Sequence, residues 1–298
     1  MAGSRTAGGK RGVAGGRQLS ARAARPSCAP VRQSVTHVKL SVSVAQTCPV
    51  RGDVQANIAE HLRLTEIAAS AGSQIVVFPE LSLTGYEIEL AEGLAFDLND
   101  SRLAPLLAAA SSHAIYIVAG APIRSDARLY IGALVLSPGG TTELYTKHRL
   151  GAFGESARRD GTVPPAEATV FHAGDRNPLV QLGRRKAALA ICADAGLDSH
   201  AANAAARGAD VYLASMFVIR SEYAGDAVRL QRYASEHSMG VALANFGSPS
   251  GGLAGAGRSA IWSPTVELLA QLDRSGSGVA TGFERADGWS ATTAMLHS

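Results

Sequence analysis

Short apolar or alternating stretches recur along the chain from residue 37 onwards, and each has the length of a β-strand. His37–Gln46 alternates apolar and polar residues, as expected of a strand with one buried face. Ile75–Phe78 is wholly apolar and stops at Pro79, which is typical of a strand buried on both faces. The same criteria predict further strands at Ala114–Ala121, Leu129–Leu136, Leu144–Lys147, Lys186–Cys192, Val211–Met216, Gly240–Asn245, Arg258–Trp262 and Val266–Gln271.

Helical patterns separate several of these strands. Asp53 can cap the first helix and Gly72 ends it. Further helices are predicted over about 101–113, Ser199–Arg207 and Ala224–His237. This alternation, without an internal repeat or a linker, predicts one α/β domain over residues 37–298. The polar stretch after Phe283 is expected to be an arm or a frayed end.

The basic residues are unevenly distributed along the chain. The 298 residues include 28 Lys and Arg against 25 Asp and Glu, a formal net charge of +3. Residues 1–36 contain seven of the basic residues and no acidic one, and subtracting these seven leaves 21 basic against 25 acidic residues in 37–298. The domain is therefore mildly acidic, and a nucleic-acid partner is not predicted.

Residues 1–36 are rich in Gly, Ala, Arg and Ser and contain no aromatic residue. Such a segment buries too little apolar surface to offset the entropy lost on ordering, so a disordered basic tail is expected. Its Arg-rich, acid-free composition leaves two alternatives open, a targeting segment and an over-extended translation start.

Compartment and cofactors follow from two further features. No apolar run approaches the roughly 18 residues of a membrane span, so no membrane partner is predicted. Cys28, Cys48 and Cys192 are too few and too scattered for a disulfide framework or a zinc site. We therefore expect a cytoplasmic protein without a metal or other cofactor.

Three chemically distinctive residues come directly after or at the end of apolar strands, namely Glu80, Lys147 and Cys192. In open α/β sheets, functional residues gather at the carboxyl ends of strands. Each residue also has an ordinary structural role open to it, since a lone Cys is often a small core residue. Glu80 could equally be a cap or surface acid, and Lys147 a solvated cation.

The residues around these positions resemble motifs of the nitrilase (carbon–nitrogen hydrolase) superfamily. Val76–Tyr86 (VVFPELSLTGY) resembles its glutamate motif, Tyr145–His148 its lysine motif, and Leu189–Asp194 its nucleophile motif. The order of the motifs is the same, and the resemblance spans roughly residues 37–285. It implies a four-layer αββα sandwich that pairs with itself into a homodimer or a larger assembly.

The resemblance also implies a chemistry that uses these three residues. Cys192 would attack the amide carbon and form a thioester, and Glu80 would carry protons among the thiol, the leaving amine and water. Lys147 and the backbone N–H of Ala193 would stabilise the oxyanion. A cation beside the thiol is also expected to favour the thiolate. The implied partner is a small-molecule amide substrate.

Members of the superfamily carry a second glutamate between the lysine and the cysteine. Glu167–Asp175 (EATVFHAGD) matches its E-x-x-x-F-x-x-G spacing. Glu167 is therefore expected to hold Lys147 and to help position substrate or water. Glu155, in the same variable loop, is the alternative.

Tyr86, Phe217 and Asp194 are candidates for the pocket wall. Anchoring the backbone of the nucleophile turn is the better interpretation for Asp194, because short polar side chains satisfy the free N–H groups of tight turns. A Cys–His hydrolase and a Glu/Cys/His metal site are two alternatives, but neither has a motif or a ligand spacing in its favour. Surface or capping roles are therefore expected for His148, His172, His200 and His237.

The residues after the nucleophile bear on the substrate. Nitrile-cleaving members usually have Trp-Glu there, and Ala193-Asp194 in this chain favours an amide or carbamoyl compound. The Arg that many members place shortly afterwards is absent, although Arg220 or Arg258 could supply a positive charge from another loop. We expect metal-independent hydrolysis of a small linear amide. The alternatives are an N-carbamoyl compound hydrolase, a nitrilase and a catalytically silent binding protein of the same fold.

Overall fold

The computed structural model describes Gly12, residues 38–154, Arg158 and residues 161–296. The chain divides into two units, Met1–Val35 and Thr36–Ser298, and every element described below belongs to the second. The tail predicted over residues 1–36 lies outside the described residues, apart from Gly12, and stays a prediction. None of the helices in the described part of the chain combines the length and the apolar character that crossing a membrane requires.

The first of two sheets has seven strands in the described residues, in the order β13-β12-β1-β2-β3-β4-β5. β2 runs parallel to β1 and β3, β4 is antiparallel to β3, and β5 is antiparallel to β4. β5 therefore points in the same direction as β2, and their carboxyl ends lie at the same edge of the sheet. The bounds are β1 Leu40–Gln46, β2 Ile75–Val77, β3 Tyr116–Ser125, β4 Arg128–Leu136, β5 Thr142–Thr146, β12 Gly278–Arg285 and β13 Gly288–Met295.

The second sheet has six strands in the described residues, in the order β11-β10-β9-β8-β7-β6. β7, β8 and β9 are parallel, so their carboxyl ends also share one edge. The bounds are β6 Leu179–Leu182, β7 Arg185–Ile191, β8 Val211–Ser215, β9 Gly240–Ala244, β10 Ala260–Trp262 and β11 Leu268–Gln271.

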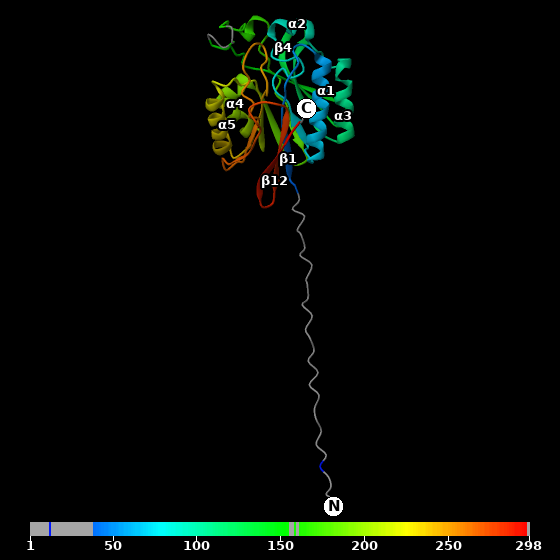
Figure 1. The fold of residues 1–298 in the computed structure, drawn as a ribbon, viewed down its shortest axis with the longest axis vertical. Helices are drawn as coiled ribbons and strands as arrows, with labels where there is room; N and C mark the ends of the chain where they lie inside the picture. The colour runs from blue at the N-terminus through cyan, green and yellow to red at the C-terminus, as the bar shows by residue number, and fades with distance from the viewer. Residues whose placement is uncertain (1–11, 13–37, 155–157, 159–160, 297–298) are drawn as a thin grey trace, which may run out of the picture. The chain divides into compact units, whose positions relative to one another are not determined.

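Helices cover the outer face of each sheet (Figure 1). α1 Val54–Ser70 and α3 Ala104–His113 pack on the first sheet, and α4 Asp198–Ala206 and α5 Tyr223–His237 on the second. As predicted, the Asp53 side chain caps α1, accepting a hydrogen bond from the backbone N–H of Ala56. Shorter elements are η1 Ile88–Leu90, α2 Ala91–Leu94, η2 Ser101–Leu103, η3 Glu167–Thr169 and η4 Cys192–Gly196. The predicted four-layer αββα sandwich is confirmed.

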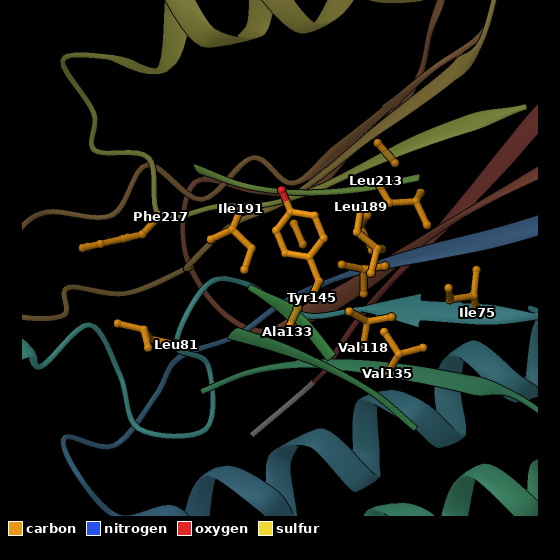
Figure 2. Packing of buried hydrophobic residues seen from close by; sticks show 14 of the residues in the cluster. Ile75, Leu81, Val118, Ala133, Val135, Tyr145, Leu189, Ile191, Leu213 and Phe217 are labelled. Carbon is orange, nitrogen blue, oxygen red and sulfur yellow. The ribbon is translucent and has the colours of Figure 1, made fainter. Parts of the chain in front are cut away.

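The largest apolar cluster lies between the two sheets. Figure 2 shows Tyr145 in this layer, with Ala133 and Val118 from the first sheet near its base and Ile191 and Leu189 from the second beside its ring. The Tyr145 hydroxyl points towards the second sheet, where it donates a 2.7 Å hydrogen bond to Oδ2 of Asp194. This hydrogen bond connects the core directly to the turn that carries Cys192.

Two sequence predictions about the sheets are wrong. The stretch after Phe283 is no arm, because it contains the end of β12 and the whole of β13, and these two strands pair along their whole length. β13 is an edge strand whose residues are largely exposed, and Ser and Thr interrupt its apolar residues, so it lacks the apolar run of a buried strand. The second error is that no strand is predicted where β6 lies, because half of the residues of this short edge strand are partly or fully exposed.

Candidate active site

Glu80, Lys147 and Cys192 lie just beyond the carboxyl ends of three strands. Lys147 and Cys192 follow β5 and β7 directly, and Phe78 and Pro79 separate Glu80 from β2. The Nζ atom of Lys147 lies 2.6 Å from Oε1 of Glu80, and both side chains are fully buried. The fold therefore brings together residues that are far apart in the sequence and come from both sheets.

Glu167 gives Lys147 a second carboxylate. Oε1 of Glu167 lies 2.7 Å from Nζ of Lys147, and Glu167 is itself buried at the start of η3. Oε2 of Glu167 accepts a 2.7 Å hydrogen bond from the backbone N–H of Gly151, which fixes the plane of the carboxylate. The alternative residue, Glu155, lies outside the described residues.

Tyr86 completes the hydrogen bonding of Glu167. Its hydroxyl donates a 2.7 Å hydrogen bond to Oε1 of Glu167. The Tyr86 ring packs against Phe153 and Phe217, with ring centroids 5.6 Å and 5.1 Å away. Phe217 is buried, and it supports Tyr86 through this ring contact.

A close backbone contact sets the position of Glu80. A Cβ atom at Gly120 of β3 would lie 2.4 Å from the carbonyl oxygen of Pro79 and 2.5 Å from the nitrogen of Leu81, so only glycine fits there. Leu81 itself has a φ of 54°, in the left-handed region that non-glycine residues rarely adopt. The loop is therefore tightly constrained on both sides of the carboxylate.

Hydrogen bonds behind this loop hold it further. The backbone N–H of Gly120 donates to Oγ of Ser82 at 3.2 Å. The Ser82 hydroxyl and Nε2 of the buried His61 are 2.9 Å apart, and Nδ1 of His61 lies 2.7 Å from the carbonyl oxygen of Asn57. Burial lowers the pKa of His61 to about 4, so this histidine is neutral, with Nδ1–H donating to Asn57 and Nε2 accepting from Ser82.

The environment of Glu80 keeps its carboxyl group near the midpoint of its titration at neutral pH. Burial raises the pKa of Glu80 to about 7, the charge of Lys147 opposes this rise, and the charge of Glu167 adds to it. Oε2 of Glu80 has no hydrogen-bond partner among the described residues. Glu80 therefore combines a free acceptor oxygen with a pKa suited to proton transfer.

The pKa values of Lys147 and Cys192 are both raised. Burial alone would lower the pKa of Lys147, but the charges of Glu80, Cys192 and Glu167 raise it, so the ammonium group stays protonated. Burial and the charge of Glu80 raise the pKa of the Cys192 thiol, and Lys147 lowers it by less. Lys147 therefore favours the thiolate, as predicted, but burial and the neighbouring carboxylate oppose it more strongly.

The turn at Cys192 has an unusual backbone. Cys192 has a φ of 44° and begins η4, so its side chain leaves the end of β7 at a sharp turn. Non-glycine residues in this region cost free energy and are concentrated at functional sites. Ala193 lines the same cavity as Cys192.

Asp194 ties this turn to the lysine strand. Its fully buried carboxylate accepts hydrogen bonds from the Tyr145 hydroxyl at 2.7 Å and from the backbone N–H of Arg149 at 2.7 Å. A longer contact of 3.2 Å joins Asp194 to the backbone N–H of His148. Asp194 therefore anchors the backbone that follows Lys147, not its own turn as predicted, and it fixes the nucleophile and the lysine relative to each other.

A cavity of about 290 Å³ opens beside Cys192. Its wall includes Glu167, Tyr86, Phe153 and Met216, so apolar and aromatic side chains surround the polar groups. Such a combination of an apolar wall with a few convergent polar groups is typical of small-molecule sites.

Four charged residues at this cavity were missed in the sequence. Arg149, Glu222, Asp226 and Arg229 contribute two guanidinium and two carboxylate groups to its wall. Asp226 and Arg229 form an ion pair. Glu222, Asp226 and Arg229 lie three or four positions apart at the start of α5, and this spacing on one helix face is the signal that could have identified them. Arg220 and Arg258, the candidates considered from the sequence, line a different cavity.

The histidines do not form a second catalytic arrangement in the described ranges. His172 is exposed, and His148 and His237 are partly exposed. The expected surface or capping role is wrong for His200, whose Nε2 and Nδ1 atoms lie 2.9 Å and 2.8 Å from the hydroxyls of Tyr145 and Tyr212. Across residues 38–154 and 161–296, together with Gly12 and Arg158, no group of three His, Cys, Asp or Glu residues is arranged to hold a metal ion.

A family model described as carbon-nitrogen hydrolase matches residues 41–283. A nitrilase from Pyrococcus abyssi is 29% identical over 241 residues, which cover 79% of this chain and 86% of the relative. Glutamine-dependent NAD(+) synthetases from Thermotoga maritima and Mycobacterium tuberculosis are 29% and 31% identical over 52% and 38% of this chain. The matched part spans only 26% and 17% of these synthetases.

Solved structures show the same fold at lower sequence identity. A complex of butyramide with a cysteine-to-alanine mutant of the amidase from Nesterenkonia sp. AN1 has a TM-score of 0.73 and 23% identity, covering 85% of this chain and 94% of the amidase chain. A glutamate-to-glutamine mutant of that amidase carries the acetamide moiety of fluoroacetamide on its active-site cysteine, with a TM-score of 0.72, 23% identity and coverages of 83% and 91%.

Proposed function

Because the chain belongs to the carbon–nitrogen hydrolase family, we propose that it hydrolyses a small linear amide through a thioester on Cys192. Glu80 is the proton carrier and Lys147 the stabiliser of the oxyanion. The observation that carries the proposal is the buried contact of one ammonium group with two carboxylates, Lys147 with Glu80 and Glu167, beside a thiol at a strained turn.

Acylation begins from a neutral thiol. Oε2 of Glu80 accepts the Cys192 proton as the sulfur attacks the carbonyl carbon, and the C–S bond forms while the carbonyl π electrons move to oxygen. The resulting oxyanion is stabilised by Lys147 and by the backbone N–H of Ala193. Glu80 then gives its proton to the amide nitrogen, the C–N bond breaks, and ammonia leaves with the thioester in place.

Deacylation reverses the roles of the same groups. Glu80 takes a proton from water as the oxygen attacks the thioester carbon, and Lys147 and Ala193 again stabilise the oxyanion. The C–S bond breaks, the sulfur of Cys192 recovers the proton from Glu80, and a carboxylic acid is released. A carboxyl group with a pKa of about 7 accepts and donates protons with similar ease near neutral pH, which suits both half-reactions.

Glu167 is proposed to act mainly through Lys147. Its Oε1 atom accepts from Nζ of Lys147, and its Oε2 atom is held by Gly151. Glu167 also lines the cavity, so it is close enough to substrate or water to help orient either of them. Every step uses side chains and backbone groups of this chain, and the proposed mechanism requires no cofactor.

The cavity supports a small substrate without a strong net charge. Its volume is about 290 Å³. Besides Glu167, whose charge is balanced by Lys147, its wall has two carboxylates, Glu222 and Asp226, against two guanidiniums, Arg149 and Arg229. Because these positive and negative groups balance, the wall favours neither a cationic nor an anionic substrate. The likeness in fold to an amidase whose mutant was solved with butyramide is consistent with a short aliphatic amide. Pairing of this chain with itself stays a prediction.

Two measurements on the full chain test this proposal. Acetamide, propionamide and butyramide should release ammonia, and rapid quenching should give an intact mass increased by the corresponding acyl group. A peptide map should assign that group to Cys192, and Cys192→Ala should lose both the adduct and the turnover. Cys48→Ala, which changes the other described cysteine, should retain both. Turnover that survives Cys192→Ala would overturn the mechanism.

A further inference from the structure

A second cavity, of about 220 Å³, is lined by three arginines from three separate loops. Arg220 lies between β8 and α5, Arg258 precedes β10, and Arg274 lies between β11 and β12. β8 and β9 run parallel to β7, β10 is antiparallel to β9, and β11 is antiparallel to β10. The loops after β8, before β10 and after β11 therefore lie at the edge of the sheet where β7 ends at Cys192. The arginines therefore share an edge of the sheet with the candidate active site.

No carboxylate among the described residues pairs with these arginines. Arg220, Arg258 and Arg274 form no ion pair and no side-chain hydrogen bond with any residue that the structure describes, whereas Arg185 pairs with both Asp210 and Glu284. Like charges around a concave surface repel one another and concentrate a positive potential in it. Such a cluster is stabilised when an anion occupies the cavity.

Arg258 is held firmly in this arrangement. Its φ of 56° lies in the left-handed region, which is costly for a non-glycine residue and is concentrated at functional positions. Its backbone N–H donates to the carbonyl oxygen of Asp273 at 3.0 Å, and its carbonyl oxygen accepts from the Tyr223 hydroxyl at 2.8 Å. The guanidinium group lies over the Tyr223 ring, with Cζ 5.4 Å from the ring centroid. Tyr223 thus orients both the backbone and the side chain of Arg258.

A second close approach joins the loops of Arg258 and Arg274. A Cβ atom at Gly257 would lie 2.4 Å from the carbonyl oxygen of Arg274, and Gly257 has a φ of 63°. Only glycine lets the two loops pack at this distance, so the spacing between the two arginines is built into the backbone.

From this geometry we propose that the cavity formed by Arg220, Arg258 and Arg274 binds a multiply charged oxyanion such as a phosphate or diphosphate group. Planar guanidinium groups make paired, charge-assisted hydrogen bonds to phosphate oxygens, and several together match a ligand with more than one charge. The site is distinct from the proposed catalytic machinery and does not depend on amide hydrolysis.

One short segment separates this oxyanion site from the catalytic cavity. Met216 and Glu222 line the catalytic cavity, and Arg220 and Tyr223, from the same segment, line the oxyanion site. The bound group therefore has two sources that share one chemistry. It is either a free anion or a charged group on a substrate long enough to reach both cavities.

Calorimetric titration of the full chain with inorganic diphosphate tests the site, with potassium chloride at matched ionic strength as the blank. We expect saturable binding that each of Arg258→Gln and Arg274→Gln weakens by about tenfold, the loss expected for one charge-assisted hydrogen bond. Arg128→Gln is the matched control, because Arg128 is exposed on β4 and outside the cluster. The arginines of residues 1–36 are present in every variant, so only differences among variants report on the cavity.

Two outcomes would overturn the site. One is the absence of saturable binding above the chloride blank, and the other is equal affinity of the cluster variants and Arg128→Gln. If Arg258→Gln lowers the melting temperature, the affinity of the double variant Arg220→Gln/Arg274→Gln tests the site instead. Both of those side chains are exposed, so they can be removed without disturbing the core. The readout is heat of binding, so a failure of the proposed hydrolase activity cannot be mistaken for a failure of this site.

Inhibition kinetics then separate the two sources of the anion. Diphosphate that competes with the amide indicates that the site holds a charged group of the substrate. Diphosphate that binds without competing indicates a separate anion. Both results require the site, and both should disappear in Arg220→Gln/Arg274→Gln.

Discussion

The Tyr86 hydroxyl donates a 2.7 Å hydrogen bond to Oε1 of Glu167, the oxygen that also accepts from Nζ of Lys147 at 2.7 Å. The other oxygen of Glu167 is held by the backbone N–H of Gly151. Three donors from two parts of the chain therefore fix one buried carboxylate. Tyr86 is a positioning residue for Glu167 and, through it, for Lys147.

Tyr86→Phe should lower kcat by about tenfold to a hundredfold while KM changes less, because one hydrogen bond to a buried charged group is lost and the ring is kept. Initial rates of ammonia release measure both parameters. Tyr130→Phe is the control, since the Tyr130 hydroxyl forms no hydrogen bond to a described residue. An unchanged kcat in Tyr86→Phe would show that Lys147 needs no such support.

The value of kcat/KM should rise with pH through about 7. Burial raises the pKa of Glu80 to about 7, and below that pH the carboxyl group already carries a proton and cannot accept one from Cys192. The charge of Glu167 contributes to this raised pKa, so Glu167→Gln should move the rising limb to lower pH in its residual activity. A pH-rate profile for both proteins checks the direction. A flat profile for the unmodified enzyme, or a limb moved upwards in Glu167→Gln, would count against Glu80 as the base.

The three central residues could be predicted because each follows an apolar run whose end is visible in the sequence. β5 ends at Thr146 and β7 at Ile191, one residue before Lys147 and Cys192 respectively, so strand position alone brings these two side chains to the sheet edge. No local sequence pattern predicts that α5 lies beside the cavity. The spacing of Glu222 and Asp226 places both on one helix face, but the approach of that face to the cavity depends on how the second sheet packs.

The end of the chain was misjudged for a related reason. β12 pairs with β1 across more than 200 positions of sequence, for example Leu40 with Glu284, and such pairing leaves no local signal. β13 then completes the sheet as an edge strand whose residues are largely exposed. The positive φ angles of Leu81 and Cys192 could not be predicted from the sequence either, since neither residue type favours a positive φ.

Gly120→Ala should abolish most activity and lower the free energy of unfolding by about 1–3 kcal/mol, the usual cost of overpacking a core. The new Cβ would lie 2.4 Å from the Pro79 oxygen and 2.5 Å from the Leu81 nitrogen, so the loop that carries Glu80 has to move. Urea denaturation and ammonia release measure the two effects. Gly139→Ala is the matched control, since the nearest atom to its Cβ is Ser137 Oγ at 3.6 Å. Gly120→Ala with the original kcat would mean that the loop position is not critical.

Lys147→Met should lower the free energy of unfolding by about 3–5 kcal/mol near pH 8, because Glu80 and Glu167 then face each other in a buried site without a cation. Removing one of these charges in Lys147→Met/Glu167→Gln should recover part of that loss but none of the activity, since the oxyanion still lacks Lys147. Without the lysine, the pKa of Glu80 rises further, so the folded state binds a proton that the unfolded state does not, and the single variant should gain stability as the pH falls from 8. Urea denaturation at several pH values measures each difference. A single variant as stable as the unmodified enzyme at pH 8 would show that Lys147 does not balance the two carboxylates. A double variant that hydrolyses amides would show that Lys147 does not serve the reaction.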